Sequence, residues 1–189
     1  MTDSPPSPSG ATTPLPPNDP NRQLSVARPD SDETLPHVGV VGDTYTMLLS
    51  GEDTAGRHTL IDMHVPPGGG PPPHRHDFEE MFTILDGEIE LTVRSATTRP
   101  RTGETVNVPA NAPHSFRNTS DRPARVLCLC SPSGQDAFFL AVGVPLTHRT
   151  EPPPALDAAA TAAFIAKAEA LAPEYRTELQ GPWTTAPSN

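Results

Sequence analysis

Short apolar runs alternate with clusters of turn-forming residues between residues 37 and 145. The runs include TYTMLLS, TLIDMHV, EMFTIL, EIELTV, ETVNVP, HSFRN and RVLCLCS, and the clusters between them are rich in Gly, Pro, Asn and Asp. Each run has about the length of one β-strand, and the clusters carry the residues that tight turns require. Many such strands between regularly placed turns predict an all-β sandwich or barrel.

One pair of runs predicts a specific local structure. In EIELTV, Ile89, Leu91 and Val93 alternate with polar residues, which predicts a strand with one buried face. The preceding Asp86-Gly87 suits a type I′ turn, in which both central residues have positive φ. We therefore expect EMFTIL and EIELTV to pair as a β-hairpin.

The two ends of the chain differ from this middle region. Residues 1–36 are rich in Pro, Ser, Thr and Asn and contain little that could be buried. Such a segment cannot offset its ordering entropy, so we expect a disordered Pro/Ser-rich tail, partly in polyproline II conformation. We assign residues 37–150 to one barrel and residues 151–189 to a C-terminal helical extension.

Within the extension, Asp157 can cap an Ala-rich helix that runs to about Leu171. We expect this helix to pack on the outside of the barrel and to carry no chemistry. The segment DAFFLAVGV, just before the extension, is compatible with a strand or a short helix. Trp183 is expected to serve packing.

Composition and charge exclude several classes of partner. The formal net charge is −10, and no basic cluster occurs that could bind nucleic acid or an anionic membrane. The N-terminus lacks the pattern of a secretory signal, and no apolar run is long enough to span a membrane. We expect a soluble cytoplasmic protein. Its two cysteines, Cys128 and Cys130, are interpreted as small buried apolar residues without a role.

A cluster of possible metal ligands follows the stretch GGGPPP. His74 and His76 are separated by one residue, so on a strand both imidazoles point to the same face. Glu80 lies four positions after His76, close enough to return to the same pocket after a turn. His114, which begins a later run, offers a further imidazole. Imidazole and carboxylate groups together suit a borderline divalent metal ion.

The spacing of these residues resembles two sequence motifs of the cupin family. The first motif, G(X)5HXH(X)3–4E(X)6G, is matched by Gly68, His74, His76, Glu80 and Gly87. The second, G(X)5PXG(X)2H(X)3N, is matched by Gly103, Pro109, His114 and Asn118. Asn111 replaces the middle glycine of the second motif, a mild departure because Asn tolerates a left-handed turn conformation.

The resemblance implies an all-β fold, the cupin double-stranded β-helix or jelly-roll barrel. It also implies that the metal ligands are His74, His76, Glu80 and His114. Glu79 is the rival carboxylate, but the six-residue gap to Gly87 favours Glu80. The metal would be a divalent ion of Fe, Mn, Ni, Co, Cu or Zn, and the ligand types do not choose among them. A site with an open coordination position would be active, whereas a closed tetrahedral zinc site would be structural.

The other histidines are given structural roles. His37, His58 and His148 are expected to be surface residues or hydrogen-bonded core residues. His64 is expected to be an ordinary strand residue, with a position near the metal as the alternative. Arg75 lies between the two ligand histidines and should point away from the metal by strand alternation.

The flanking stretches HVPPGGGPPPHRHDFEE, RNTSDRPARVL and SPSGQDAFF are similar to single-domain quercetin-dioxygenase-like cupins. This resemblance implies a metal-dependent dioxygenase, an oxidoreductase that acts on a small hydroxylated, enol-like or aromatic substrate with O2. It also implies that Glu80 acts as a general base. The alternatives are a non-catalytic ligand-binding or sensor protein and a metal-dependent isomerase or decarboxylase. The oligomeric state stays open, although the edges of such sheets are compatible with a homodimer.

Overall fold

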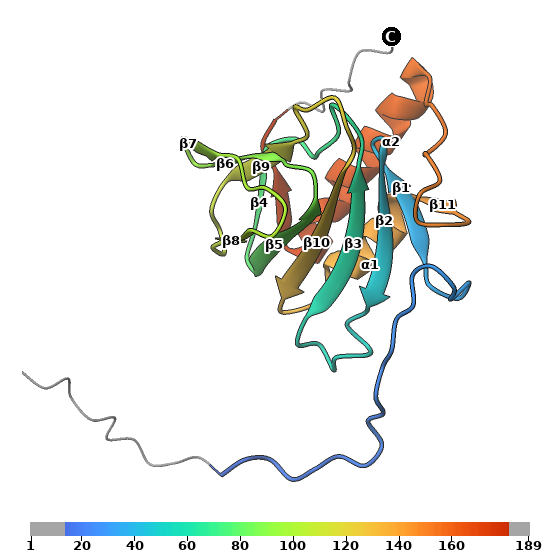
Figure 1. The fold of residues 1–189 in the computed structure, drawn as a ribbon, viewed down its shortest axis with the longest axis vertical. Coiled ribbons are helices and arrows are strands. Elements are labelled where there is room, and N and C mark those ends of the chain that lie inside the picture. Colours follow the sequence, from blue (N-terminus) through green and yellow to red (C-terminus); the bar gives the residue numbers. More distant parts are fainter. Residues whose placement is uncertain (1–13, 182–189) are drawn as a thin grey trace, which may run out of the picture.

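The computed structural model describes residues 14–181, and its fold is two antiparallel β-sheets that face each other (Figure 1). The larger sheet has the order β11-β1-β2-β3-β10-β5-β8 and the smaller one the order β12-β4-β9-β6-β7. The strands of the larger sheet are β1 (His37–Val40), β2 (Asp43–Leu49), β3 (Thr59–Val65), β5 (Glu79–Asp86), β8 (Thr105–Val108), β10 (Ala124–Ser131) and β11 (Val144–Leu146). Those of the smaller sheet are β4 (His74–His76), β6 (Glu90–Val93), β7 (Ala96–Thr98), β9 (His114–Arg117) and β12 (Thr177–Leu179). This arrangement confirms the predicted jelly-roll barrel.

Strand alternation places the core between the two sheets. In β10 every second residue is buried, and the fully buried side chains of β3 and β5 point to the same interior. The largest of these side chains are Ile61, Met63, Phe82, Ile84 and Val126. Their burial is the main favourable contribution to folding, and it fixes the pairing register, because a shift by one residue would turn each apolar face to solvent.

The predicted hairpin at Asp86-Gly87 is wrong. Strand β5 pairs with β10 and β8, whereas β6 pairs with β9 and β7, so the two runs lie in different sheets. Gly87 has a φ of 78°, but Asp86 still belongs to β5. The turn therefore carries the chain from one sheet to the other. The residues Asp86-Gly87 predicted a turn at the correct place. They could not show that each of the two runs pairs with other strands, distant in the sequence, instead of with its neighbour.

The predicted C-terminal helix is confirmed as α2 (Ala158–Leu171), and the side chain of Asp157 accepts a hydrogen bond from the backbone N–H of Ala160 at 2.8 Å. A 3-10 helix, η1 (Ala172–Tyr175), continues it. The ambiguous segment before the extension forms the helix α1 (Gln135–Val142) and then β11. Figure 1 shows both helices behind β2, β3 and β10. Trp183 lies outside the described residues.

The C-terminal extension also contributes a strand that the sequence did not reveal. Strand β12 pairs with β4, so that Thr177 lies opposite His76 and Leu179 opposite His74. Between these pairs, Arg75 points outward and its Nε atom donates a hydrogen bond to Glu178 at 3.1 Å. The extension therefore lies directly beside the strand that carries two of the predicted ligands.

The described part of the N-terminal tail, residues 14–36, forms no helix or strand. It contacts the barrel through exposed hydrogen bonds, for example from Arg22 to the backbone carbonyl of Asp53 and from Arg149 to Asp30. Among residues 14–181, no helix is both long and apolar enough to cross a membrane.

Candidate metal centre

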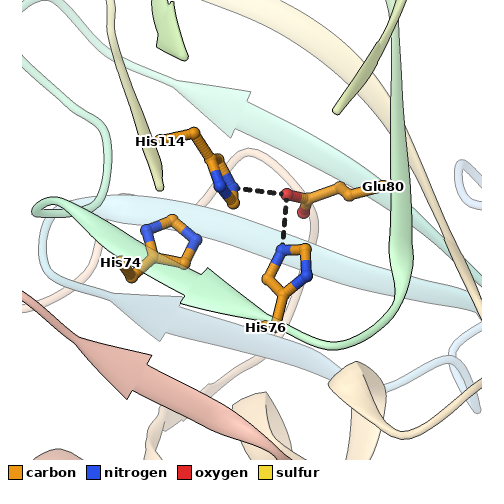
Figure 2. Close-up of side chains that lie close together, drawn as sticks. All are labelled: His74, His76, Glu80 and His114. Carbon is orange, nitrogen blue, oxygen red and sulfur yellow. Dashed lines mark hydrogen bonds and ion pairs between the residues drawn. The ribbon is translucent and has the colours of Figure 1, made fainter. Parts of the chain in front are cut away.

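Three strands from both sheets bring the predicted ligands together in the barrel interior. Strand β4 carries His74 and His76 on one face, β9 places His114 opposite His74, and β5 supplies Glu80 from the other sheet. The four side chains point toward one another (Figure 2). All four are buried, and their ligand atoms lie within 4.8 Å of one another. The structure thus gathers all four predicted ligands, and the cluster could hold a metal ion.

Backbone carbonyls orient all three imidazole rings. The Nδ1 atoms of His74, His76 and His114 lie 2.8, 3.0 and 2.9 Å from the carbonyl oxygens of Pro72, Phe78 and Ala112, respectively. A carbonyl can only accept a hydrogen bond, so each Nδ1 carries the proton. In a neutral ring the lone pair is then on Nε2, the atom that faces the centre. Hydrogen bonds of this kind fix the tautomer and orientation of metal-binding histidines.

The donor set fits a cation. The Nε2 atoms of His76 and His114 lie 3.1 and 3.0 Å from Oε2 of Glu80 (Figure 2). Two nitrogen lone pairs and a carboxylate oxygen at such distances repel one another unless a positive charge lies among them. A proton on a ring nitrogen can supply that charge, and so can a divalent metal ion, which imidazole and carboxylate ligands suit.

The pKa shifts agree with a site that is built to hold positive charge. Burial, together with the neighbouring His114, lowers the pKa of His74 to about 3, so this ring is neutral. Burial alone would raise the pKa of Glu80, but hydrogen bonds from His114 and His76 outweigh it and hold this pKa well below its usual value. Burial would likewise lower the pKa of His114, yet the contact with Glu80 raises it. A bound metal would displace the proton that this pair holds.

Glu80 and Glu79 have different environments. Glu79 is exposed, and its carboxylate accepts hydrogen bonds from the side chain of Asn107 at 2.7 Å and the backbone N–H of Ala110 at 3.1 Å. It therefore holds the turn before β9 from the outside. Glu80, one residue later on β5, points inward, in agreement with the spacing argument that favoured it.

The second turn confirms the interpretation of Asn111. This residue has a φ of 63°, the left-handed conformation in which the family motif has glycine. Its backbone N–H donates a hydrogen bond to the carbonyl of His76 at 2.7 Å. The turn of the second motif thus supports the strand of the first.

The Gly-Pro segment before β4 passes very close to β9. A side chain at Gly70 would bring its Cβ into collision with the carbonyl oxygen of Phe116, so only glycine fits there. Farther back, the N–H of Gly68 donates to the carbonyl of Asn118 at 2.7 Å, and the N–H of Asn118 donates to Gly69 at 3.0 Å. These contacts connect the start of the first motif to the end of the second. They therefore fix β4 and β9, the strands that carry the histidines, relative to each other.

The two cysteines have surroundings that the sequence did not indicate. Both are buried, as expected, but Sγ of Cys128 lies 3.2 Å from Oε1 of Glu80 and Sγ of Cys130 lies 3.9 Å from it. The thiols therefore contact the carboxylate oxygen that the histidines leave free. Only the register of β10 against β5 reveals this, because it places Cys130 opposite Glu80.

A small cavity adjoins the centre. It has a volume of about 30 Å³, enough for a water molecule. Its polar lining includes His74, Glu80, Tyr45, Gln135 and Thr177. The rest is mainly apolar and aromatic: Val40, Val41, Met63, Pro71, Pro72, Phe116, Phe138, Phe139, Val142 and Leu179. Helix α1 and strand β12 thus close the pocket, so the C-terminal extension forms part of its wall through β12, whereas α2, the helix expected outside the barrel, does not line it.

The remaining histidines lie away from the centre. Nδ1 of the buried His37 lies 2.8 Å from the hydroxyl of Thr46. His64 is half-buried on β3, on the alternate face from the buried Met63 and Val65, opposite Arg125 of β10. His148 is exposed and His58 is half-buried. These positions agree with the structural roles expected for them.

Comparison with known proteins finds a family model, a curated enzyme and solved structures that this chain resembles. The family model for the cupin domain matches residues 61–130, which contain all four clustered residues. Quercetin 2,3-dioxygenase of Bacillus subtilis is 29% identical over 128 residues, which are 67% of this chain but only 37% of that enzyme. The chain therefore spans little more than a third of that relative.

Two solved structures share the fold. KdgF from Halomonas sp. is 15% identical with a TM-score of 0.53, covering 61% of this chain and 99% of that one. An RmlC-like cupin from Shewanella frigidimarina is 15% identical with a TM-score of 0.51, covering 61% and 96%. At this identity the likeness concerns the fold alone. Taken with the two motifs and the buried histidine–glutamate cluster, the domain match shows that residues 61–130 of this chain form a cupin domain.

Proposed function

We propose that this protein is a metal-dependent dioxygenase that acts on a small hydroxylated, enol-like or aromatic substrate. The buried cluster of three histidines and one glutamate, at the base of an apolar cavity with aromatic walls, is the observation on which we base it. The 29% identity to a quercetin 2,3-dioxygenase supports the choice of reaction.

His74, His76, His114 and Glu80 would hold the metal ion. When bound, a divalent transition metal would polarise a substrate oxygen and favour its deprotonated form. The protein's own contribution is to orient the rings through the three backbone carbonyls and to bury them in the barrel interior. Fe, Mn, Ni, Co, Cu and Zn are all compatible with this ligand set.

Glu80 would accept the proton of the substrate hydroxyl. Its Oε2 atom contacts two imidazoles, whereas Oε1 contacts only the two thiols, which are weak hydrogen-bond donors. Oε1 therefore has the weaker hydrogen-bond partners, and we assign proton transfer to this oxygen. Glu80 also lines the cavity, where the substrate hydroxyl would lie.

The substrate must displace part of the cavity wall to enter. A volume of about 30 Å³ accepts a water molecule but no ring. We assign this displacement to α1, β12 and the proline segment 71–72, since the other lining residues, apart from Val41 and Gly70, belong to strands of the barrel. Closure after entry would keep water from the reacting groups.

The decisive experiment combines metal analysis with oxygen uptake. Protein purified without chelator should contain one transition-metal ion per chain, and a panel of flavonols and small enols should include a compound that drives oxygen consumption. Turnover without oxygen uptake would instead indicate an isomerase or decarboxylase. Stabilisation by a ligand without turnover would indicate a binding protein. If no metal binds even after reloading, the proposed enzymatic function is wrong.

A further inference from the structure

Gln135, the first residue of α1, has a buried side chain with an unpaired polar atom. It is 4% exposed and lines the cavity beside the histidine–glutamate cluster. Its Oε1 atom is buried without a hydrogen-bond partner within the described part of the chain. An unpaired buried amide carbonyl destabilises a protein by roughly 1–3 kcal/mol, so native structures contain few of them.

The other polar side chains of the cavity already have protein partners. The hydroxyl of Tyr45 donates to Asp43 at 3.0 Å, and that of Thr177 donates to the carbonyl of Tyr175 at 3.2 Å. Nδ1 of His74 donates to the carbonyl of Pro72, and Oε2 of Glu80 contacts Nε2 of the two other histidines. Asp43 Oδ1 also lacks a partner, but Asp43 is not among the residues that line the cavity. Gln135 is thus the lining side chain that is left available to a ligand.

We propose that Gln135 is the polar anchor of the substrate pocket, accepting a hydrogen bond from a hydroxyl group of the ligand. This inference rests on the proposed function, because it places the ligand between the metal centre and α1. The metal-binding end of the ligand would face His74 and Glu80, its apolar body would contact Phe116, Phe138 and Phe139, and its hydroxyl would reach Gln135.

The lining also restricts the charge of the ligand. No lysine or arginine is among the described residues that line the cavity. A second carboxylate or a phosphate on the ligand would therefore be buried without a cationic partner, which is strongly unfavourable. The pocket suits an apolar or aromatic hydroxy compound that is neutral outside its metal-binding group. Dicarboxylic acids and phosphorylated sugars do not fit this chemistry.

Matched pairs of small chelators can test the anchor. Maltol and its 2-hydroxymethyl analogue share one enol-ketone group and differ by one hydroxyl, as do allomaltol and kojic acid. The two pairs place the additional hydroxyl on different sides of the ring. Dissociation constants would be measured by calorimetry on full-length protein loaded with Co²⁺, for the native protein, Gln135→Leu and Thr177→Val. Thr177→Val is the control, because it removes a hydroxyl of the same cavity that already has a partner.

In at least one pair, the hydroxyl should tighten binding to the native protein about tenfold, the effect of one well-formed hydrogen bond. Gln135→Leu should abolish this difference, whereas Thr177→Val should keep it. The anchor role is wrong if neither pair shows the preference, if the preference survives in Gln135→Leu, or if no pyranone binds. Oxygen uptake is measured separately, so a preference that depends on Gln135 without oxygen uptake would retain the anchor and reject the dioxygenase.

The metal-free protein gives a second readout. Replacing an unpaired buried amide with an apolar side chain of similar size should be neutral or stabilising. Gln135→Leu is therefore expected to keep or raise the melting temperature. A fall of several degrees would show that Gln135 holds the structure together and would overturn the proposal. If the leucine variant does not fold, Gln135→Met, which keeps an unbranched side chain, takes its place in both measurements.

Discussion

Nε2 of His114 lies 3.0 Å from Oε2 of Glu80, although the two residues belong to different sheets and are 34 positions apart. Because their Nδ1 atoms are committed to backbone carbonyls, His114 and its neighbour His76 can approach the carboxylate only with a positive charge among them. The strand that carries Glu80 is therefore joined to the histidine strands through this charge. Whatever supplies the charge also connects the two halves of the barrel.

Metal removal should consequently lower the stability of the whole domain. An ion that binds only the folded state contributes about 3 kcal/mol at roughly 100 times its Kd. We expect a chelator to lower the melting temperature by several degrees and His114→Ala to abolish stoichiometric metal binding. His64→Ala is the matched control, because His64 lies on the alternate face of β3 from the core. Metal analysis of both variants decides, and equal metal content in the two would contradict the assigned site.

The proposed general-base role of Glu80 can be tested by comparing substitutions at Glu80 and at its neighbour Glu79. Glu80→Gln keeps the shape of the side chain but removes the proton acceptor, so turnover should be lost while much of the metal stays bound. Glu79→Gln should retain activity and lower the melting temperature slightly, since one hydrogen bond to Asn107 or Ala110 weakens. Oxygen uptake and metal content would be measured for each variant. Full activity in Glu80→Gln would remove the base role.

The two thiols should be unreactive in the folded protein. The contact with Cys130 and burial raise the pKa of Cys128 well above its usual value. The contact with Cys128 would lower the pKa of Cys130, but burial and the nearby Glu80 outweigh it and raise this pKa. Since the thiolate is the reactive form, a thiol reagent at neutral pH should label neither residue. Labelling of both should follow unfolding. Rapid modification of the native protein would mean that the thiols are accessible near Glu80.

The ligand set could be predicted because the residues match two family motifs, the second of which supplied the distant His114. His74 and His76 share a strand face, and the choice of Glu80 over Glu79 rested on the motif's distance to the next glycine. The contacts of Cys128 with Glu80 and the role of Gln135 were not predictable. Both depend on how distant elements are placed against each other, and no local pattern encodes the register of β10 against β5.

The errors have the same origin. The turn at Gly87 was predicted at the right position, but its partners were wrong because β9 and β10 provide longer-range pairing. Strand β12 consists of three residues, TEL, which carry no strand signal by themselves. It forms because β4 has a free edge beside it.

The left-handed turn at Asn111 offers a direct test of the motif. A residue with a Cβ and no hydrogen-bonding side chain costs roughly 1 kcal/mol at a φ of 63°. Asn111→Gly, which restores the family motif, should therefore be neutral or slightly stabilising, whereas Asn111→Ala should be destabilised by about that amount. Urea denaturation of the two variants would measure the difference. Equal stability would show that the turn relaxes to another conformation.

Asp43 should make the stability of this protein depend on pH. Burial raises the pKa of its carboxyl to about 8, against the opposing effect of the hydrogen bond from Tyr45. Between about pH 4 and pH 8 the folded protein then holds a proton that the unfolded chain has lost, so stability falls as the pH rises through this window and levels off above it. The total loss is on the order of a few kcal/mol, since one pKa unit corresponds to about 1.4 kcal/mol.

Asp43→Asn isolates this contribution, because an amide resembles the protonated carboxyl at every pH and can still accept the hydrogen bond from Tyr45. We expect the variant to match the native protein near pH 5 and to become the more stable of the two by pH 8. Chemical denaturation at both pH values gives the free energies of unfolding, and their difference cancels the titration of all other groups. A difference that stays constant with pH would mean that Asp43 is ionised in the folded protein as well.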